Sequence, residues 1–507
     1  MSAISVTTGV EHVDVLIVGA GISGIGQAYY LQTQQPDRTF AILEARGATG
    51  GTWDLFRYPG IRSDSDLHTF SYEFKPWEND KAIAGAPAIL DYLRETAAEN
   101  GIDDRIRLHH KVLSSAWSTY DARWLIEIER ADTGERLTMS CGWLFCAGGY
   151  YRYDQGFTPE FEGRDRFGGQ IVHPQHWPED LDYSGKRVVV IGSGATAVTL
   201  IPAMAGTAAH VTMLQRSPTY VIPLPSEDAI ANALRGLLGA KLAYAITRRK
   251  NVIQQRAIYR LCKRYPRTAK KVIRYLNAQR LPKGYPVDEH FRPAYNPWDQ
   301  RLCVVPDGDL FKAIRDGDAS VVTDRIETFT ERGIKLESGR ELEADIIVTA
   351  TGLNMQAFGG VTMTVDGAEV NVAEKVAFKS LMLDGVPNFA FTMGYTNSSW
   401  TLKVGLVGDH FTRLLAHMDA NGHNICYPQI SNPQMATQPL WGIGSGYVQR
   451  AIDQFPRQGN DGPWRMTMDY NYDAKMLREG PVDDQNLRFA SNITTSAAPA
   501  DDLALVS

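Results

Sequence analysis

A glycine-rich loop close to the N-terminus has the residue types and spacing that hold a pyrophosphate. Gly19, Gly21 and Gly24 form a GxGxxG motif. The first glycine permits a tight turn, the second lets the backbone approach a phosphate, and the third lets a helix pack closely on a strand. Glu44 follows Gly24 by 20 residues, where a carboxylate accepts hydrogen bonds from ribose hydroxyls. A lone GxGxxG motif is weak evidence, but together with this acid it predicts a dinucleotide site.

A second loop of the same kind contains Gly192, Gly194 and Ala197 in the sequence GSGATA. The strand expected after it ends in Arg216 and Ser217 instead of an acid. A carboxylate would repel a 2′-phosphate, whereas a guanidinium and a hydroxyl bind it through charge-assisted hydrogen bonds. The second loop therefore predicts NADP(H) in preference to NAD(H). The alternative is that Arg216 is an ordinary surface cation.

Each loop must be positioned by a buried strand before it and a helix after it. Apolar runs at 13–18 and 187–191 precede the two loops, and helical sequences follow them. Further strands are expected at 39–44 and 210–216. Two such strand, loop, helix and strand units predict an α/β protein with two Rossmann-like dinucleotide-binding domains.

Two dinucleotide loops in one chain imply a flavoprotein that binds FAD in the first loop and NADPH in the second. Disulfide reductases share this layout but need a paired-cysteine centre. The chain has five cysteines with no CxxC spacing, so we expect electrons to pass to oxygen instead. No metal site is expected, because the pairs His109/His110 and His173/His176 have no accompanying set of carboxylates or cysteines.

The composition is that of an ordinary globular protein. The chain has 507 residues, enough for about three domains. Hydrophobic residues make up 44% and charged residues 22%, which excludes a disordered, collagen-like or rod-like chain. No apolar run reaches a membrane-spanning length, and the first apolar segment leads into the glycine-rich loop rather than a cleavage site. We expect a reduced, cytoplasmic protein.

Positive charge is concentrated in one segment of a chain whose net charge is −6. Between residues 229 and 287 there are 15 Lys and Arg and no Asp or Glu. Apolar residues at helical spacing predict several amphipathic helices there. The favoured interpretation is a solvated helical face beside an anionic cofactor, and weak association with an anionic membrane surface is the alternative. Nucleic acid is not expected as a partner, because no recognised binding motif accompanies the charge.

Two longer motifs narrow the class of flavoprotein. Residues 167–178 fit FxGxxxHxxxWP, and residues 50–64 fit GGxWxxxxYPGxxxD. Together they resemble the fingerprints of type I Baeyer–Villiger monooxygenases, in the flavin-containing monooxygenase superfamily. The amino-acid sequences of these segments are most similar to those of the subgroup that contains the mycobacterial ethionamide-activating monooxygenase. The resemblance extends over residues 13–489.

The resemblance implies roles for individual residues. FAD contacts would come from the first loop and its surroundings: Gly19, Gly21, Ser23, Gly24, Glu44, Thr52, Trp53, Asp54, Leu55, Arg62, Ser63, Asp64 and Val112. NADP contacts would come from Gly192, Ser193, Gly194, Ala195, Thr196, Ala197, Val198, Arg216 and Ser217. Arg301 falls where the family keeps its essential arginine, and Asp64 would orient it through an ion pair. Gln300 stands where many relatives carry Lys, which would weaken the preference for NADPH.

The implied reaction uses NADPH and O2 to form a C4a-peroxyflavin. This species would convert ketones to esters or lactones and oxidise thioethers or thioamides at sulfur. Arg301 would stabilise negative charge during the reaction, because a guanidinium stays protonated at any working pH. The sequence leaves two alternatives, which are an N- or S-oxygenating flavin monooxygenase without ketone oxidation and a non-oxygenating NADPH-binding flavoprotein. The sequence assigns no oligomeric state.

The expected architecture has three parts. Residues 1–155 and 380–507 would form a discontinuous FAD-binding domain. Residues 156–225 and 301–379 would form the NADP-binding domain inserted into it. Residues 226–300 would form the basic helical insertion. His173 and Trp177 would lie in the linker between the two cofactor domains, where the resemblance implies coupling of domain motion and simple packing is the alternative.

Overall fold

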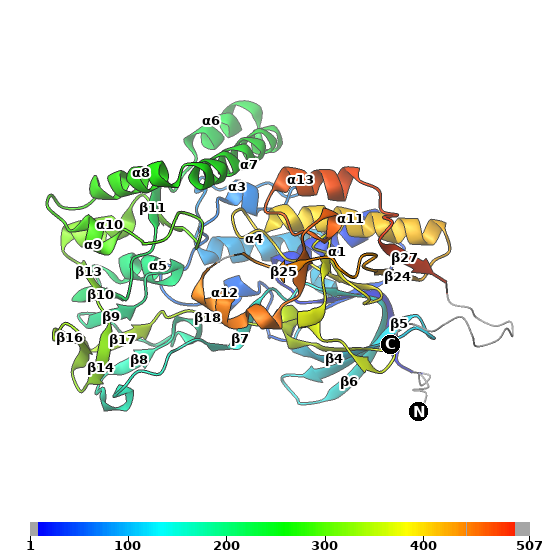
Figure 1. Cartoon of the computed structure of the whole chain (residues 1–507), viewed down its shortest axis with the longest axis horizontal. Coiled ribbons are helices and arrows are strands. Elements are labelled where there is room, and N and C mark those ends of the chain that lie inside the picture. The colour runs from blue at the N-terminus through cyan, green and yellow to red at the C-terminus, as the bar shows by residue number, and fades with distance from the viewer. Residues whose placement is uncertain (1–8, 443, 492–507) are drawn as a thin grey trace.

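A computed structural model describes residues 9–442 and 444–491. The two largest sheets lie side by side, with the larger one on the right of Figure 1 and the smaller one on the left. The helices α6, α7 and α8 lie across the top of this view. This mixed α/β architecture with parallel strands confirms the predicted fold class. No helix in the described part of the chain is long and apolar enough to cross a bilayer.

The larger sheet combines a parallel half with an antiparallel meander. Its order is β20-β19-β4-β5-β6-β1-β2-β3, with β23 also paired to β6. The strands are β1 (Glu11–Val18), β2 (Phe40–Leu43), β3 (Ile106–Arg107), β4 (His110–Ser118), β5 (Arg123–Arg130), β6 (Arg136–Cys146), β19 (Thr362–Val365), β20 (Ala368–Glu369) and β23 (Phe389–Phe391). Helices α1 (Ile22–Gln34), α4 (Ala86–Glu99) and α11 (Thr401–Ala420) supply apolar side chains to one of its faces.

The alternation of side chains along β1 explains why both faces of this sheet are buried. Val15 and Ile17 belong to the core shared with α1, α4 and α11, whereas Leu16 belongs to the core on the other side and Val18 packs against that core. Successive residues of a strand point to opposite faces, so an uninterrupted apolar strand requires cover on both. The second face packs against later segments of the chain, which include Phe358, Trp441 and Phe455.

The smaller sheet is entirely parallel and has the order β13-β10-β9-β17-β8. Its strands are β8 (Gln170–Val172), β9 (Arg187–Ile191), β10 (His210–Gln215), β13 (Ala319–Thr323) and β17 (Ile346–Thr349). Helices α5 (Ala195–Met204) and α10 (Asp309–Asp316) pack on one face, and the antiparallel strands β14 (Ile326–Thr330), β15 (Gly333–Leu336) and β16 (Glu341–Glu343) contribute to the core on the other. Both predicted strand, loop and helix units are present.

The basic insertion forms three consecutive helices and a short fourth one. They are α6 (Ala229–Leu238), α7 (Ala240–Arg264), α8 (Pro266–Ala278) and α9 (Val287–His290). The chain leaves the smaller sheet through β11 (Val221–Leu224) and returns through β12 (Cys303–Pro306), which pair in parallel. This pairing brings both ends of the insertion together. Helices α6, α7, α8 and α9 all fall within residues 226–300.

The return to the larger sheet occurs earlier than the sequence predicts. The sequence predicts that residues 301–379 belong to the NADP-binding domain. Strand β19, at Thr362–Val365, lies within this range but pairs with β4 of the larger sheet. Met363 of β19 is buried in the core of that sheet. Strand β18 (Leu353–Met355) pairs with β7 (Tyr151–Gly156), so the outward and return crossings between the sheets run together. We propose that the inserted domain ends at this strand pair, near residue 355.

Candidate functional site

The first glycine-rich loop joins β1 to α1 in a conformation that excludes other residues. Gly19 has a φ of +102°, in the region that favours glycine. A Cβ on Gly24 would lie 1.9 Å from the carbonyl oxygen of Gly19, so the third glycine permits the helix to pack against the turn. Gly21 is the N-cap of α1 and supplies no side-chain cap. The first turn of α1 thus offers backbone N–H groups to an anion.

A cavity of about 640 Å³ opens beside this loop. Glu44 lines it and is buried, with its two carboxylate oxygens held by backbone groups. Oε2 accepts from Ala20 N at 2.9 Å, and Oε1 accepts from Arg46 N at 3.0 Å. Burial raises the pKa of Glu44 above its ordinary value. The remaining acceptor capacity of this fixed carboxylate is available to a ligand in the cavity.

Most of the predicted FAD contacts line this cavity. They are Gly19, Gly21, Ser23, Glu44, Thr52, Trp53, Arg62, Ser63, Asp64 and Val112. Trp53 belongs to the one-turn helix α2 (Thr52–Leu55). Arg62 forms an ion pair with Asp309 of α10 at 2.5 Å, which ties this wall to the smaller sheet's helices.

Three predicted contacts do not line the cavity. Gly24 lies beneath the loop, and Leu55 packs against the core of the smaller sheet. Asp54 is fully buried and accepts from three guanidinium groups, which belong to Arg46 at 2.7 Å, Arg57 at 3.2 Å and Arg94 at 3.1 Å. The Asp54 side chain therefore anchors α2 to these arginines and does not line the cavity. The motif's spacing alone does not distinguish the two sides of so short a helix.

A second cavity, of about 980 Å³, opens beside the second loop. Of the predicted NADP contacts, Gly192, Ser193, Gly194, Ala195, Thr196, Arg216 and Ser217 line it. Ala197 and Val198 are buried beneath the loop instead. Gly192 has a φ of +136°, and a Cβ there would meet Ala350 O at 2.3 Å.

The side chain of Arg216 is exposed at the edge of this cavity. Within the described residues it forms no ion pair or hydrogen bond. Ser217 lies beside it, and its carbonyl oxygen accepts a hydrogen bond from Ser193 Oγ at 3.3 Å. An unpaired guanidinium next to a hydroxyl at the end of β10 is a suitable site for a phosphate monoester.

Asp64, Tyr151 and Arg301 line both cavities and so mark the place where they meet. The negative charge of Asp64 raises the pKa of Arg301 well above its ordinary value. The expected direct ion pair is not formed, since no contact within 4.0 Å joins the two groups in the described structure. Asp64 acts on Arg301 through its charge at longer range. The guanidinium is permanently charged and lines both cavities.

Several residues that line the two cavities lie outside every motif recognised in the sequence. Trp400 precedes α11 and donates from Nε1 to Ser23 Oγ at 2.7 Å, at the wall of the first cavity. Tyr447 and Arg450 of α12 (Gly446–Ala451) line the second cavity. Burial raises the pKa of Tyr447 to about 12, so its hydroxyl stays protonated near neutrality. These residues come from the last quarter of the chain and could be found only from the fold.

The linker motif lies against the two strands that cross between the sheets. His173 Nε2 is 3.2 Å from the carbonyl oxygen of Gly352, just before β18. A Cβ on Gly156, at the end of β7, would lie 2.0 Å from the His173 ring. Burial lowers the pKa of His173, so the ring is neutral near pH 7. Its position is consistent with both coupling and packing roles.

Comparisons with known proteins agree with this architecture. A model described as flavin-binding monooxygenase-like matches residues 84–373, and an NAD(P)-binding Rossmann-like model matches residues 17–79. The FAD-containing monooxygenase EthA of Mycobacterium tuberculosis H37Rv is 53% identical over 481 residues, which cover 95% of this chain and 98% of EthA. The probable FAD-binding monooxygenase AlmA of Acinetobacter baylyi is 47% identical, over 96% of this chain and 97% of AlmA.

Solved structures show the same fold at lower identity. A steroid monooxygenase bound to NADP superposes with a TM-score of 0.73 at 23% identity, over 95% of this chain and all of that one. Cyclohexanone monooxygenase from Rhodococcus sp. Phi1, bound to NADP+, has a TM-score of 0.72 at 19% identity, over 95% of this chain and 100% of that one. With two glycine-rich loops, two joined cavities and relatives matched over almost their whole length, the chain belongs to the flavin-binding monooxygenase-like family.

Proposed function

We propose that the chain is an FAD- and NADPH-dependent monooxygenase. It would convert ketones to esters or lactones and oxidise thioethers or thioamides at sulfur. The observation that carries this proposal is the position of Arg301 where two dinucleotide-sized cavities meet. When bound, FAD would take hydride from NADPH and use O2 as the source of the inserted oxygen atom.

The residues of the first cavity fit FAD. The N-terminus of α1 would offer N–H groups to the pyrophosphate. Gly21 lies beside Gly51, whose Cα would be 3.6 Å from a Cβ on Gly21, so a side chain there would narrow this part of the cavity. Glu44 offers fixed carboxylate oxygens to the adenosine ribose. The cavity is lined by the carboxylate of Glu44 and by the indole rings of Trp53 and Trp400. This combination suits a long ligand with polar and aromatic parts.

The residues of the second cavity fit NADPH. Arg216 and Ser217 would bind the 2′-phosphate, and the loop at Gly192 and Gly194 would hold the pyrophosphate. Arg450 also lines this cavity, with its guanidinium 3.4 Å from the centre of the Phe157 ring. Gln300 lies at the cavity without a positive charge, so most of the preference for the 2′-phosphate would depend on Arg216.

Arg301 would act directly on the substrate. Its guanidinium remains charged at every working pH, because Asp64 lies near it and raises its pKa. A fixed cation beside the ketone carbonyl stabilises the negative charge that develops on the carbonyl oxygen during attack. Asp64 makes no direct ion pair with Arg301 within the described residues, so the guanidinium charge is not neutralised by direct contact.

The experiment that tests this function uses the purified chain with its flavin. We expect a yellow protein that releases FAD on denaturation and oxidises NADPH faster when a ketone or sulfide is added. Products are then identified by chromatography across cyclic, linear and aryl ketones and sulfides. Sulfoxide without ester or lactone would favour the N- or S-oxygenating alternative. NADPH oxidation that no substrate stimulates, with no oxygenated product, would favour a non-oxygenating flavoprotein.

A further inference from the structure

Helix α7 of the insertion buries several polar side chains. Tyr244, Arg248 and Asn251 are buried against the segment around α3 (Leu67–Phe70). Arg248 Nη1 donates to the carbonyl oxygens of His68 at 3.1 Å and Ser71 at 2.9 Å. A helix on the surface of a globular protein normally buries its apolar face and exposes its polar one. In α7 the buried Tyr244, Arg248 and Asn251 side chains form hydrogen bonds instead.

The outward face of α7 is correspondingly apolar. Leu242, Ile246 and Ile253 recur at intervals of four and seven residues, which places them on one side of the helix. The exposed fractions of Leu242 and Ile253 are 54% and 55%. Large aliphatic side chains that stay half exposed in a row indicate a surface that is covered in use.

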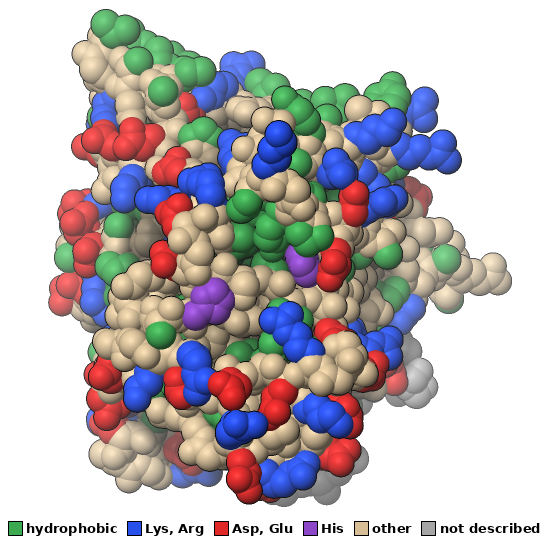
Figure 2. Space-filling view, turned by 90° about the vertical axis from the view of Figure 1, so that its left-hand side faces the viewer, with side chains coloured by type: hydrophobic (Ala, Val, Ile, Leu, Met, Phe, Trp, Pro, Cys, Tyr) green, Lys and Arg blue, Asp and Glu red, His purple; other side chains and the backbone are tan. Residues whose placement is uncertain are grey.

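Exposed apolar side chains also occur on the neighbouring helices α6 and α8. We define the apolar ridge as Leu237 of α6, Leu242, Ile253 and Leu261 of α7, and Val272 and Tyr275 of α8, all at least half exposed. Figure 2 shows hydrophobic side chains along the upper edge of the molecule, at the height where Figure 1 places α6, α7 and α8. The ridge lies outside the two cofactor cavities, since none of its residues lines either of them.

Positive charge surrounds the apolar ridge. No Asp or Glu occurs between residues 229 and 287, against 15 Lys and Arg. Of these cations, Lys241, Arg249, Arg267, Lys271 and Lys283 are exposed and form no ion pair within the described residues. Two copies of such a surface would repel one another, which argues against self-association through it. Apolar side chains mixed with free cations match an anionic bilayer, which offers both hydrocarbon and negative headgroups.

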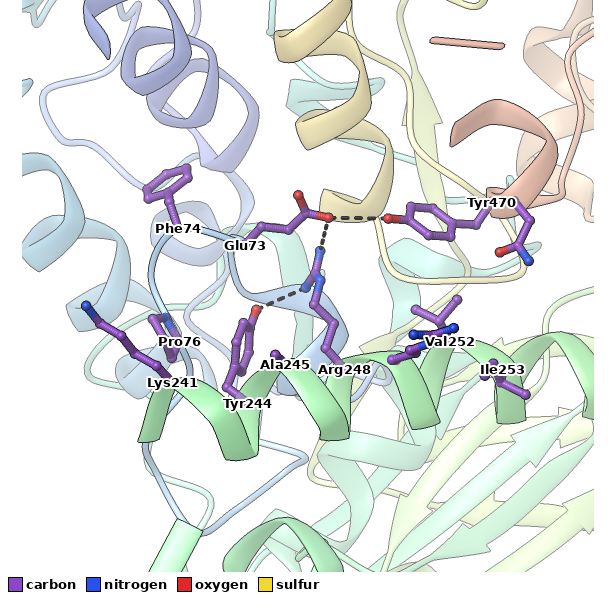
Figure 3. Close-up of a pocket in the computed structure, with 12 residues that line it drawn as sticks. Glu73, Phe74, Pro76, Lys241, Tyr244, Ala245, Arg248, Val252, Ile253 and Tyr470 are labelled. Carbon is purple, nitrogen blue, oxygen red and sulfur yellow. Dashed lines mark hydrogen bonds and ion pairs between the residues drawn. The ribbon is translucent and has the colours of Figure 1, made fainter. Parts of the chain in front are cut away.

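A cavity of about 690 Å³ opens under the same helix, between α7 and the segment at Glu73 (Figure 3). In this view Tyr244 and Arg248 rise from α7 toward Glu73. Glu73 is neutralised by Arg478, whose Nη2 lies 2.5 Å from its Oε2. Lys241 and Arg249 also line the cavity and remain unpaired within the described structure. The cavity therefore carries excess positive charge beside apolar side chains, as a phosphate headgroup requires.

We propose that the apolar ridge docks on the surface of an anionic phospholipid bilayer. The ridge would insert side chains into the boundary between headgroups and acyl chains, and the unpaired cations would contact the headgroups. The 690 Å³ cavity would receive one headgroup phosphate. This docking is peripheral and does not depend on the proposed reaction.

Co-sedimentation of the full-length, flavin-loaded protein with vesicles tests the docking. We expect binding to vesicles that contain phosphatidylglycerol, little binding to pure phosphatidylcholine, and loss of binding at high salt. Arg267→Gln combined with Lys271→Gln removes two exposed cations and should lower the partition coefficient about 30-fold. Leu242→Ser should lower it about tenfold. A soluble glycerol phosphate should not displace the protein from vesicles if the ridge supplies much of the binding.

Matched changes outside the insertion provide the control. Tyr120 is 90% exposed in the turn after β4, and Lys186 is exposed before β9. Tyr120→Ser with Lys186→Gln should leave vesicle binding unchanged, and flavin content should be the same in all variants. Equal binding to neutral and anionic vesicles, or no binding to either, would overturn the proposal. Concentration-dependent dimers that Leu242→Ser dissolves would also overturn it, because a second copy would then cover the ridge.

Discussion

Arg301 is the residue on which the proposed chemistry depends. It lies where the two cavities meet, and no ion pair within the described structure neutralises it directly. Arg301→Ala should lower ester and sulfoxide formation about 100-fold or more, because the charge that stabilises the attacked carbonyl is lost. Reduction of FAD by NADPH does not need that charge and should survive. Stopped-flow absorbance follows flavin reduction, and chromatography measures the product.

Arg301→Lys separates charge from shape at the same position. A lysine keeps the positive charge but loses the planar fork and its reach, so we expect strong impairment here too. Oxygen consumed by either variant should appear as H2O2. Product formation by Arg301→Ala at near the unmutated rate would show that the reaction does not depend on this cation.

Arg216 determines the choice of nicotinamide cofactor in this account. Its exposed guanidinium has no protein partner in the described residues, so its charge is available to a 2′-phosphate. Arg216→Ala should reduce the preference of kcat/KM for NADPH over NADH by about 1.5–3 kcal/mol. Activity with NADH should change little, which serves as the internal control. Equal use of both cofactors by the unmutated enzyme would show that Arg216 is an ordinary surface cation.

At the scale of elements, the first strand, loop and helix depend on Gly24. The missing Cβ would lie 1.9 Å from Gly19 O, so Gly24→Ala must push α1 away from the turn. We expect the variant to lose most of its flavin and about 3 kcal/mol of stability. The ratio of flavin to protein absorbance and the thermal midpoint measure these effects.

Gly236→Ala is the matched control for this change. Gly236 lies in α6, and a Cβ there would meet nothing within 4 Å. Alanine favours a helix over glycine by about 1 kcal/mol, so this variant should keep its flavin and be equally or slightly more stable. Normal flavin content in Gly24→Ala would show that the close contact does not shape the loop.

The sequence predicts these elements well because their signals are local. An apolar run, three spaced glycines and an acid or arginine after the next strand all lie within a few dozen residues. The sequence does not predict that the Asp54 side chain forms ion pairs instead of lining the first cavity, because its three arginine partners are brought together by tertiary packing. Tyr447 and Arg450 reach the second cavity from a distant helix, and no spacing rule encodes that approach.

At the scale of the whole molecule, two predictions from the sequence needed the structure to refine them. The chain returns to the larger sheet at β19, because Met363 completes the core on that side. The insertion has the expected helices, but α7 buries polar side chains and exposes large aliphatic ones. Periodicity shows that two faces exist and does not show which one is buried.

Buried ionisable groups give the folded molecule a pH dependence. His410 of α11 is buried with Nδ1 2.9 Å from Leu477 O, and burial lowers its pKa to about 3. The unfolded chain takes up a proton near pH 6.5, whereas the folded one does so only near pH 3. This contribution to stability is therefore complete above about pH 6.5 and is lost as the pH falls toward 3.

The His410 contribution amounts to about 5 kcal/mol over that range. Denaturant unfolding at several pH values should show that the free energy of unfolding decreases as the pH is lowered from about 6.5 toward 3. His410→Asn removes the titrating group and should reduce the slope by up to one proton. An unchanged slope in this variant would assign the acid sensitivity to other groups.

The central claim is that the chain transfers one oxygen atom of O2 to its substrate at the expense of NADPH. The most direct measurement is the mass of the product formed by the purified, flavin-loaded enzyme under ¹⁸O2 with NADPH and a ketone or sulfide. We predict one ¹⁸O atom in each ester, lactone or sulfoxide and close to one NADPH consumed for each product molecule. Product without ¹⁸O, or NADPH oxidation that yields only H2O2 with every substrate, would contradict the account.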